Sequence, residues 1–439
     1  MLKTRVVILE MPNCMGRWMM IALVDCNNFY ASCERVFNPK LENIPVIILS
    51  NNDGCVIARS NEAKKIGIKM GEPLFKIEAL CLSQHVAILS SNFALYADMS
   101  NRVMTILRDM APRQEVYSID ECFLYLNGFS KDRIDALAIE NIKKVKMWSG
   151  IPVSIGVGKS KVQAKIATDL AKTYKKRFNG YCNFYEFSED IQNKILKEYQ
   201  VGDIWGVGKR YNERLNRLSI RSAYDLKYAD SIRIKREFGV IMEKIVLELN
   251  GIPCIETETL KPKQQIMVSR SFRNEIVKKD DVSKLISLFT EMAAKKLRIQ
   301  KSYCSAITVF LSSNRFLDEV YSNSISVAFD RTNDTIKLVK EVMKGLECIY
   351  SNNYGYKRAG IILSGIVQSQ VIQNSLFEPV DEIKLSKNRK LMQIYDCINN
   401  KFECGIGLAS SSGDESEYIK RERTSPHYTT KLSDIIVVR

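Results

Sequence analysis

The sequence predicts an α+β protein of several domains, and three observations lead to that fold class. The chain has 439 residues, of which 46% are hydrophobic, so it can bury more than one core. Short β-branched and aromatic runs alternate with helical patterns up to residue 172, which favours helices packed on a common sheet. From residue 261 to about 367 the composition changes to strand-rich segments. We therefore expect three or four structural units.

The segment 1–19 fits poorly with the rest of the chain. Its early Lys/Arg pair and short apolar run resemble the start of a signal peptide, but Glu10 and Pro12 cut the apolar region short. We interpret this segment as a disordered extension or as the product of a misassigned start, because Met19 or Met20 would begin the first strand cleanly.

Alternating and helical periodicities assign the elements that follow. Strands are predicted at 21–25, 46–49, 55–58, 86–89, 116–126 and 153–157. Helices are predicted at 29–36, 61–66, 94–110, 131–148 and 160–172, with a further helical piece from Pro73. Asn51-Asn52-Asp53-Gly54 is a strong turn signal between the second and third strands. The order is compatible with a ferredoxin-like sheet interrupted by an insertion near residues 46–90.

The predicted strand from Val116 to Leu126 is interrupted by two adjacent carboxylates, Asp120 and Glu121. Because side chains alternate between the faces of a strand, one acid should point into the core, where it is costly unless it is paired or bound to a metal. The alternative is that the strand breaks at a surface turn, with both acids in water. A second apolar strand ends at Asp25, and pairing of the two strands would bring three carboxylates together. Such oxygen clusters bind hard divalent cations, and two-metal sites catalyse phosphoryl transfer.

The composition indicates a polyanionic partner and argues against several other classes of protein. A net charge of +15 and a pI near 9.1 make nucleic acid the leading candidate. No uninterrupted apolar run reaches the length of a membrane span, so we expect no membrane partner. The 12 cysteines form no Cys-x-x-Cys pair and only two histidines are present, which argues against a zinc site and a secreted disulfide scaffold. We interpret the cysteines as buried thiols in a reducing cytoplasm.

A glycine turn lies further along the chain, where Gly206 and Gly208 are followed by Lys209 and a helical pattern. This arrangement resembles a helix-hairpin-helix, whose backbone N–H groups can bind a DNA phosphate without reading the base sequence. The alternative is a plain helical turn.

Three motifs follow one another along the chain: Ala22-Leu23-Val24-Asp25-Cys26-Asn27-Asn28-Phe29-Tyr30-Ala31-Ser32-Cys33-Glu34, Tyr117-Ser118-Ile119-Asp120-Glu121 and Ser154-Ile155-Gly156-Val157-Gly158-Lys159-Ser160-Lys161. Together they resemble the Y-family translesion DNA polymerases, in particular the bacterial UmuC branch. The resemblance covers nearly the whole chain from about Met20. Gly158-Lys159-Ser160 alone suggests a phosphate-binding loop, but that loop needs a glycine five residues before Gly158, and position 153 is Val.

The resemblance implies a right-hand polymerase with a ferredoxin-like palm, a small fingers insertion, a helical thumb and an α/β little finger. The activity that it implies is template-directed, low-fidelity DNA synthesis past lesions, in DNA repair and the SOS response. The domains would be the palm at 20–45 and 91–187, the fingers at 46–90, the thumb at 188–255, the little finger at 256–368 and a C-terminal tail at 369–439.

The family's catalytic positions match Asp25, Asp120 and Glu121, which would bind two Mg²⁺ ions together with the backbone carbonyl of Cys26. One ion would lower the pKa of the primer 3′-hydroxyl, and the other would neutralise the triphosphate and its leaving group. Carboxylates suit this task because magnesium prefers hard oxygen ligands.

Two aromatic residues and two fingers residues match positions around the nucleotide. Tyr30, next to Phe29, matches the steric gate, whose ring leaves no room for a 2′-hydroxyl. The alternative for Tyr30 is a core tyrosine that packs the first helix. Cys55 and Ile57 match positions that would roof the nascent base pair loosely, which suits damaged templates.

The resemblance assigns the triphosphate to Lys64 and Lys172. Many members of the family carry Tyr and Arg around the first of these positions, where this chain has Asn61 and Lys64. Lysine keeps the charge but lacks the bidentate fork of arginine. The alternative for both lysines is a solvated helix face.

Further partners are implied for the C-terminal part of the chain. The peptide Gln373-Asn374-Ser375-Leu376-Phe377 resembles the one that binds the bacterial sliding clamp, with Leu376 and Phe377 filling an apolar pocket and Gln373 supplying a hydrogen bond. The sequence from Ser425 to Thr430 resembles the UmuC tail, and a UmuD-type subunit follows from the family likeness. Basic residues between the little-finger strands favour a DNA-facing sheet: Lys295, Lys296, Arg298 and Lys301.

Two other functions stay open at this point. One is another palm-type nucleotidyl transferase, such as a nucleotide cyclase, against which the thumb, the clamp peptide and Tyr30 argue. The other is a non-catalytic, DNA-bound scaffold, against which the intact Asp25, Asp120 and Glu121 argue.

Overall fold

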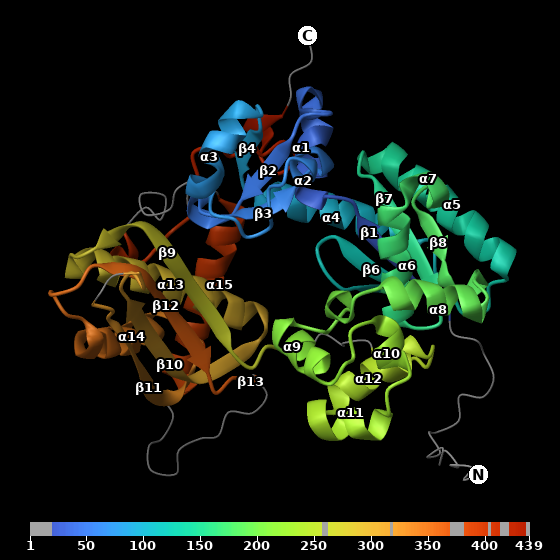
Figure 1. Cartoon of the computed structure of the whole chain (residues 1–439). Coiled ribbons are helices and arrows are strands. Elements are labelled where there is room, and N and C mark those ends of the chain that lie inside the picture. Colours follow the sequence, from blue (N-terminus) through green and yellow to red (C-terminus); the bar gives the residue numbers. More distant parts are fainter. Residues whose placement is uncertain are drawn as a thin grey trace. The chain divides into compact units, whose positions relative to one another are not determined.

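The computed structural model describes residues 20–256, 262–316, 319–368, 382–402, 405–412 and 421–435. The chain forms two compact units, which Figure 1 shows as a cartoon. The first unit consists of Met1–Ser50, Cys55–Thr257 and Arg423–Arg439, and the second of Asn51–Gly54 and Glu258–Glu422. The predicted α+β, multidomain fold class is confirmed.

A five-stranded sheet forms the centre of the first unit, with strand order β5-β6-β1-β7-β8. Its middle strand β1 pairs antiparallel with β6 and with β7, and every residue of β1 is buried. The strands are β1 (Ile21–Cys26), β5 (Arg113–Val116), β6 (Glu121–Tyr125), β7 (Val153–Gly158) and β8 (Tyr181–Asn183). The helices around this sheet are α1 (Phe29–Phe37), α4 (Phe93–Arg108), α5 (Lys131–Ser149), α6 (Lys161–Thr173) and α7 (Lys175–Phe178).

Alternation along β1 decides which of its side chains meet which helices. Every second side chain from Ala22 to Cys26 packs in one hydrophobic cluster with residues of α4 and α5. Ile21 and Leu23 belong to a different cluster that includes Ala164 of α6. Asp25 follows Leu23 by two residues, so it lies on the α6 side of the sheet.

The prediction of one strand over 116–126 is wrong, because β5 ends at Val116 and β6 begins at Glu121. The backbone N–H groups of Tyr117 and Ser118 both donate to the Glu121 carbonyl at 3.1 Å, and the Ser118 hydroxyl accepts from the Glu121 N–H at 3.0 Å. A serine that bonds the local backbone in this way competes with a continuous ladder. The chain therefore turns at this point, although both acids are half-buried rather than in water.

A three-stranded sheet of order β3-β2-β4 lies within residues 46–90. Strand β2 pairs antiparallel with β3 and parallel with β4, so β4 is an outer strand of this sheet. The elements are β2 (Val46–Leu49), β3 (Val56–Arg59), α2 (Asn61–Lys65), α3 (Leu74–Ser83) and β4 (Ala87–Ser90).

A group of helices follows and packs against α6 around a hydrophobic cluster of its own. The fully buried Glu248 links the two parts, because its carboxylate accepts from the Val162 N–H of α6 at 3.1 Å. An acid at this end of a helix stabilises the exposed N–H groups. The helices are α8 (Glu189–Glu198), α9 (Lys209–Arg217), α10 (Ala223–Lys227), α11 (Ser231–Phe238) and α12 (Val240–Leu249).

The second unit contains an antiparallel sheet of order β11-β10-β12-β9, with α13 and α14 sharing its hydrophobic core. Arg298, one of the basic residues expected to face DNA, instead makes a two-pronged ion pair with Asp396 at 2.6 and 2.7 Å. Its charge is therefore matched inside the unit, which corrects that expectation. The elements are β9 (Ile266–Ile276), α13 (Lys279–Ile299), β10 (Ser302–Ser312), β11 (Ser322–Thr332), α14 (Thr335–Ile349), β12 (Tyr356–Ser364), β13 (Val367–Gln368) and α15 (Glu382–Lys401).

Two predictions from composition can be compared with the described ranges. No helix in these ranges combines the length and the apolar character needed to cross a membrane. The cysteines within the same ranges are all free thiols, and most of them are buried, as predicted.

Candidate active site

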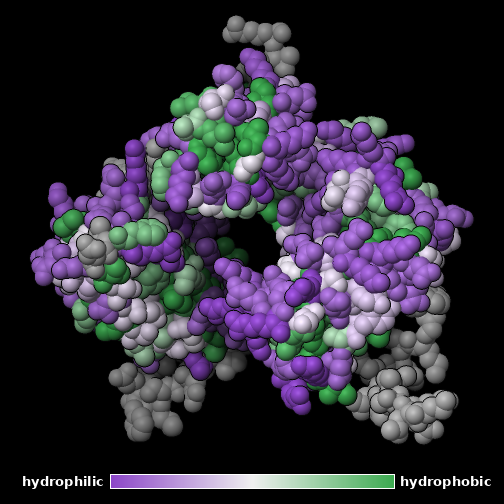
Figure 2. Space-filling model, in the orientation of Figure 1, coloured by the Kyte–Doolittle hydropathy of each residue, from purple (hydrophilic) through white to green (hydrophobic). Residues whose placement is uncertain are grey.

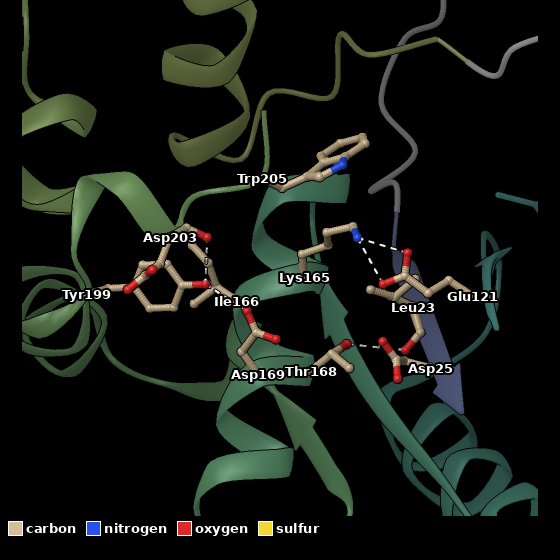
Figure 3. Close-up of a pocket in the computed structure, with 10 residues that line it drawn as sticks. All are labelled: Leu23, Asp25, Glu121, Lys165, Ile166, Thr168, Asp169, Tyr199, Asp203 and Trp205. Atoms are coloured by element: carbon tan, nitrogen blue, oxygen red, sulfur yellow. Dashed lines mark hydrogen bonds and ion pairs between the residues drawn. The ribbon is translucent and has the colours of Figure 1, made fainter. Parts of the chain in front are cut away.

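Pairing of β1 with β6 brings two of the predicted carboxylates together. Asp25 of β1 lies directly opposite Glu121 of β6 in the antiparallel register. Both line a cavity with residues of α6 and with Tyr199 and Trp205 from the helical part of the unit (Figure 3). The prediction that paired strands would converge acids is therefore correct for Asp25 and Glu121.

Asp25 is buried and carries a charge that needs a counter-charge. Its side chain is 10% exposed, and its Oδ2 lies 2.5 Å from the Nζ of Lys172 on α6. Burial raises the pKa of the Asp25 carboxyl to about 7, although the Lys172 ammonium opposes this shift and the Glu121 carboxylate adds to it. Asp25 is thus a carboxylate that a nearby cation would stabilise in its ionised form.

Glu121 has its own ammonium partner. Lys165 of α6 donates to both Glu121 oxygens, at 2.9 and 3.0 Å, as the dashed lines in Figure 3 show. The Lys165 Nζ also lies 5.1 Å from the ring centroid of Tyr117 and 5.3 Å from that of Trp205. Trp205 donates from its indole N–H to the Tyr117 hydroxyl at 3.1 Å. The two rings therefore orient the lysine that faces Glu121.

Asp120 belongs to the turn between β5 and β6. The Ser118 hydroxyl donates to Asp120 Oδ1 at 2.6 Å, which fixes the carboxylate. The Cys26 N–H donates to the Asp120 carbonyl at 2.8 Å, so the predicted backbone ligand at Cys26 lies beside this turn. The turn therefore places all three acids at one end of the β1–β6 pair.

The donor set fits a hard divalent cation, although the acids do not form a ready cluster. Within the described part of the chain, no three His, Cys, Asp or Glu side chains are grouped closely enough to hold a metal ion. Asp25 and Glu121 have lysine ammonium groups as counter-charges instead. All the candidate ligands are oxygens, and the raised pKa of Asp25 is the kind of shift that a bound cation reverses.

Tyr30 lies among other rings on α1. Its ring stacks on Tyr96 with centroids 4.4 Å apart and planes at 15°, and the Phe93 ring meets it edge-on at 6.0 Å. Burial raises the pKa of Tyr30, and the negative charge of Asp120 adds to the shift. Phe29 lies in the hydrophobic core, so a contact from Phe29 to a nucleotide would have to use its backbone.

A concentration of positive charge surrounds Lys64, which lies on α2 within the 46–90 insertion. Burial lowers the pKa of Lys64, and the positive charges of Arg59, Lys172 and Lys175 lower it further. The Lys64 Nζ donates to Asn28 Oδ1 at 2.7 Å. These charges favour an anionic ligand at this place. Asn61, Cys55 and Ile57 lie on the same insertion and are half-buried.

The glycine turn is present, with a shorter element before it than a helix-hairpin-helix implies. Gly206 has φ +92°, and a Cβ there would lie 2.9 Å from Ile245, so only glycine fits. A single 3₁₀ turn, Val201–Asp203, precedes it, and Gly208 caps α9. Lys209 is exposed at the start of α9, whose visible face is hydrophilic in Figure 2.

Sequence reasoning identified Lys172 but missed Lys161 and Lys165 of α6, and it also missed Arg59 and Lys175 near Lys64. Lys161, Lys165 and Lys172 are spaced four and seven residues apart, which puts them on one side of a helix. That spacing was the available signal. Arg59 and Lys175 carried no comparable signal. The three ion pairs to the sheet are Lys161–Glu115 at 2.9 Å, Lys165–Glu121 at 2.9 Å and Lys172–Asp25 at 2.5 Å.

The segment 1–19 and the predicted clamp peptide with Gln373, Leu376 and Phe377 lie outside the described residues.

Comparisons with known proteins agree with this architecture. Residues 24–169 match the impB/mucB/samB family, residues 263–376 match the C-terminal domain of that family, and residues 389–438 match a domain of unknown function, DUF4113. A solved chimera of Y-family DNA polymerases, Dbh-Dpo4(243-245)-Dbh, has a TM-score of 0.60 and 22% identity, and the match covers 80% of this chain and 99% of the chimera. At that identity the match bears on the fold alone.

Curated relatives align along almost the entire chain. Protein ImpB of Salmonella typhimurium is 39% identical over 426 residues, which are 96% of this chain and 100% of ImpB. Protein UmuC of Salmonella typhimurium is 38% identical over 426 residues, with 96% of this chain and 100% of UmuC covered. The chain therefore belongs to the impB/mucB/samB family, the UmuC branch of the Y-family DNA polymerases.

Proposed function

We propose that this chain is a translesion DNA polymerase that joins deoxyribonucleotides to a primer 3′-hydroxyl at the site around Asp25 and Glu121. Membership in the UmuC branch supports the enzyme class. One observation carries the assignment of the site: Asp25 lies opposite Glu121 on the α6 side of the sheet, and each acid meets a lysine of that helix. Phosphoryl transfer needs carboxylates that can bind metal ions and cationic side chains that can face the phosphates, and this arrangement supplies both.

Asp25, Asp120 and Glu121 would bind two Mg²⁺ ions, with the Cys26 carbonyl as a further ligand. When bound, the ions would lower the pKa of the 3′-hydroxyl and neutralise charge on the triphosphate and the leaving group. The turn closed by Ser118 orients Asp120, and the register of β1 and β6 orients the other two acids. The protein itself therefore supplies positioning and counter-charge.

Lys172 would change partners during this reaction. Its side chain is 32% exposed while that of Asp25 is 10% exposed, so the lysine can turn toward solvent without burying a charge. Once Asp25 binds a cation, the ammonium of Lys172 is free to bind the triphosphate. Lys64, Arg59 and Lys175 would extend the same positive region, and each charge-assisted hydrogen bond would position the phosphates.

Tyr30 would select deoxyribose. Stacking on Tyr96 limits the movement of the Tyr30 ring, and Tyr30 lies on α1, which directly follows the strand that ends with Asp25 and Cys26. A ring fixed there would collide with a 2′-hydroxyl on the incoming sugar. Ile57 and Asn61 would contact the nucleotide from the fingers insertion.

Other partners follow from the same family. The N–H groups after Gly206 and Gly208, together with Lys209, would bind a phosphate of the primer–template duplex. The peptide with Gln373, Leu376 and Phe377 would bind the sliding clamp. A UmuD-type subunit would bind in the cytoplasm, where we place the enzyme.

Primer extension with full-length protein, Mg²⁺ and dNTPs tests the proposal. Asp120→Asn and Glu121→Ala should each lower incorporation by about 10²–10³-fold, because each removes a charge that acts in the transition state. Binding of the primer–template, measured by fluorescence anisotropy, should change little. Asp190→Asn, on an exposed acid at the start of α8, is the matched control and should retain full activity.

The same assay separates the alternatives. A scaffold would show no extension with the native chain, and a nucleotide cyclase would consume nucleotides without a primer. Unchanged extension in both acid variants would overturn the assignment of the site.

A further inference from the structure

The C-terminal segment from Arg423 to Ile435 is part of the first unit, although the second unit precedes it in the sequence. It belongs to the region that matches a domain of unknown function. The segment begins beside β4, the outer strand of the β3-β2-β4 sheet, through a parallel bridge between Ser90 and Thr424. The Ser90 N–H donates to the Arg423 carbonyl at 3.0 Å, and the Arg423 N–H donates to the Ser90 hydroxyl at 3.1 Å. The segment thus extends an open sheet edge, which is a common way to bind a chain.

Asn92 joins the segment to α4. Its Oδ1 accepts from the Leu95 N–H at 3.3 Å and so caps the helix, while its Nδ2 faces the tail. That amide donates to the Ser425 carbonyl at 3.1 Å, to the Ser425 hydroxyl at 3.0 Å and to the Pro426 carbonyl at 3.2 Å. Because Asn92 is 1% exposed, water cannot reach its side-chain amide, and the C-terminal segment supplies the hydrogen-bond acceptors that this amide needs.

Glu34 connects the tail to the aromatic residues. It lies on α1 four residues after Tyr30 and is 1% exposed. A single carboxylate oxygen, Oε1, accepts from the Tyr96 hydroxyl at 2.7 Å and from the Ser425 hydroxyl at 3.0 Å. Burial raises the pKa of Glu34, whereas these two hydrogen bonds lower it. A buried carboxylate of this kind fixes its donors firmly, because losing either leaves it poorly satisfied.

The contacts continue from Glu34 to the proposed sugar gate. Tyr96 donates to Glu34 and stacks on Tyr30 with ring centroids 4.4 Å apart. At the C-terminal end of α1, the Tyr428 ring stacks on Phe37, with centroids 4.9 Å apart and planes at 10°. The tail therefore contacts α1 at its C-terminal end and, through Glu34, on the side that carries Tyr30.

We infer that Arg423–Tyr428 is a positioning element for the nucleotide site, in which Ser425 and Glu34 orient Tyr96 and thereby hold the Tyr30 ring against the sugar. This inference rests on the proposed role of Tyr30 as the gate. Ser425 and Glu34 are positioning residues, because they act through Tyr96 and do not touch the nucleotide. A function of the tail is then sugar discrimination, exerted from a segment that follows the second unit in sequence.

The test compares kcat/KM for dCTP and rCTP in full-length variants. Ser425→Ala removes one donor to Glu34, and the dCTP preference should fall about three- to tenfold, since the loss of one hydrogen bond to a charged group changes an equilibrium by about that factor or more. Ser425→Thr keeps the hydroxyl and should restore the preference. Ser433→Ala is the matched control, because its exposed hydroxyl donates only to Asp434 among the hydrogen bonds observed, and the preference should not change.

Tyr30→Ala separates failure of this inference from failure of the gate itself. The gate is wrong if Tyr30→Ala leaves the dCTP preference unchanged. If Tyr30→Ala abolishes the preference but Ser425→Ala leaves it intact, the gate stands and the positioning role of the tail is overturned. On the Tyr30→Ala background, Ser425→Ala should have no additional effect on the preference. A fall in melting temperature with equal losses for both nucleotides would indicate a merely structural tail and would also overturn the inference.

Discussion

The two ends of α6 carry similar ion pairs that differ in their exposure to solvent. At its N-terminal end, Lys161 bonds Glu115 at 2.9 Å, with the two side chains 3% and 9% exposed. At its C-terminal end, Lys172 bonds Asp25 at 2.5 Å, but the lysine is 32% exposed. The same lysine–carboxylate chemistry therefore occurs once in a closed site and once at an open one.

The surroundings explain the difference. Glu115 also accepts the Tyr125 hydroxyl at 2.6 Å, and Lys161 also reaches the Glu256 carbonyl at 3.3 Å. Because both side chains of the Lys161–Glu115 pair make these further hydrogen bonds inside the protein, neither would gain by exchanging its partner. Asp25 retains a pKa near 7 despite Lys172, which means that its ionised form is poorly compensated. The solvent-exposed Lys172 could therefore give up its place beside Asp25 to a metal ion. The buried Lys161–Glu115 pair instead stabilises the folded protein.

The largest effect should come from breaking the closed pair. Lys161→Met removes the ammonium that pairs with the buried Glu115 carboxylate, and the free energy of unfolding should fall by about 3–5 kcal/mol. Urea denaturation monitored by circular dichroism measures this free energy of unfolding. Adding Glu115→Gln to Lys161→Met should recover most of the loss, and a single variant as stable as the native chain would refute the distinction between the two ends.

The next effect concerns the stability of the metal-free protein against pH. The pKa of Asp25 is raised from 3.8 to about 7 in the folded state, so between these values the folded chain keeps a proton that the unfolded chain has lost. Stability should therefore fall as the pH rises from about 4 to about 7, by up to about 4 kcal/mol. Asp25→Asn should flatten this slope in EDTA.

Magnesium sharpens the same experiment. Because bound cations stabilise only the folded state, Mg²⁺ should raise the melting temperature of the native chain at pH 7.5 but not that of Asp25→Asn. If the free energy of unfolding of Asp25→Asn still fell between pH 4 and pH 7, a titratable group other than Asp25 would be the cause.

The smallest effect should come from breaking the open pair. Lys172→Met should lower the free energy of unfolding less than Lys161→Met does, because Asp25, whose pKa is already about 7, can take up a proton when the ammonium is lost. The kcat/KM for dCTP should fall about 10–100-fold, because one charge-assisted contact to the triphosphate is lost. If Lys172→Met lowered the free energy of unfolding as much as Lys161→Met and left kcat/KM unchanged, both ion pairs would have a purely structural role.

Local patterns predicted many of the elements and part of the site. The helix expected at 131–148 is α5 over Lys131–Ser149, and the strand expected at 153–157 is β7 over Val153–Gly158. These predictions succeed because periodicity depends on which face a segment buries, and that is written into neighbouring residues. Asp25 could be identified for the same reason, as an acid at the end of a wholly apolar strand.

Predictions failed where a distant or local polar partner overrode the pattern. The turn after Val116 exists because Ser118 bonds the backbone of Glu121, a choice that β-branched and aromatic composition does not reveal. Arg298 pairs with Asp396 from a helix that lies far along the chain, so its basic character was mistaken for a DNA-facing charge.

The sequence by itself determined the strand that carries Asp25, several of the helices and the family. Only the tertiary structure decided which lysine meets which acid, that Glu34 bonds both Tyr96 and Ser425, and that the C-terminal segment returns to the first unit. The physical reason is the separation along the sequence of the residues that interact. Alternation and helical periodicity are properties of adjacent residues, whereas ion pairs, ring stacking and edge pairing depend on which distant segments the packed cores bring within a few ångströms.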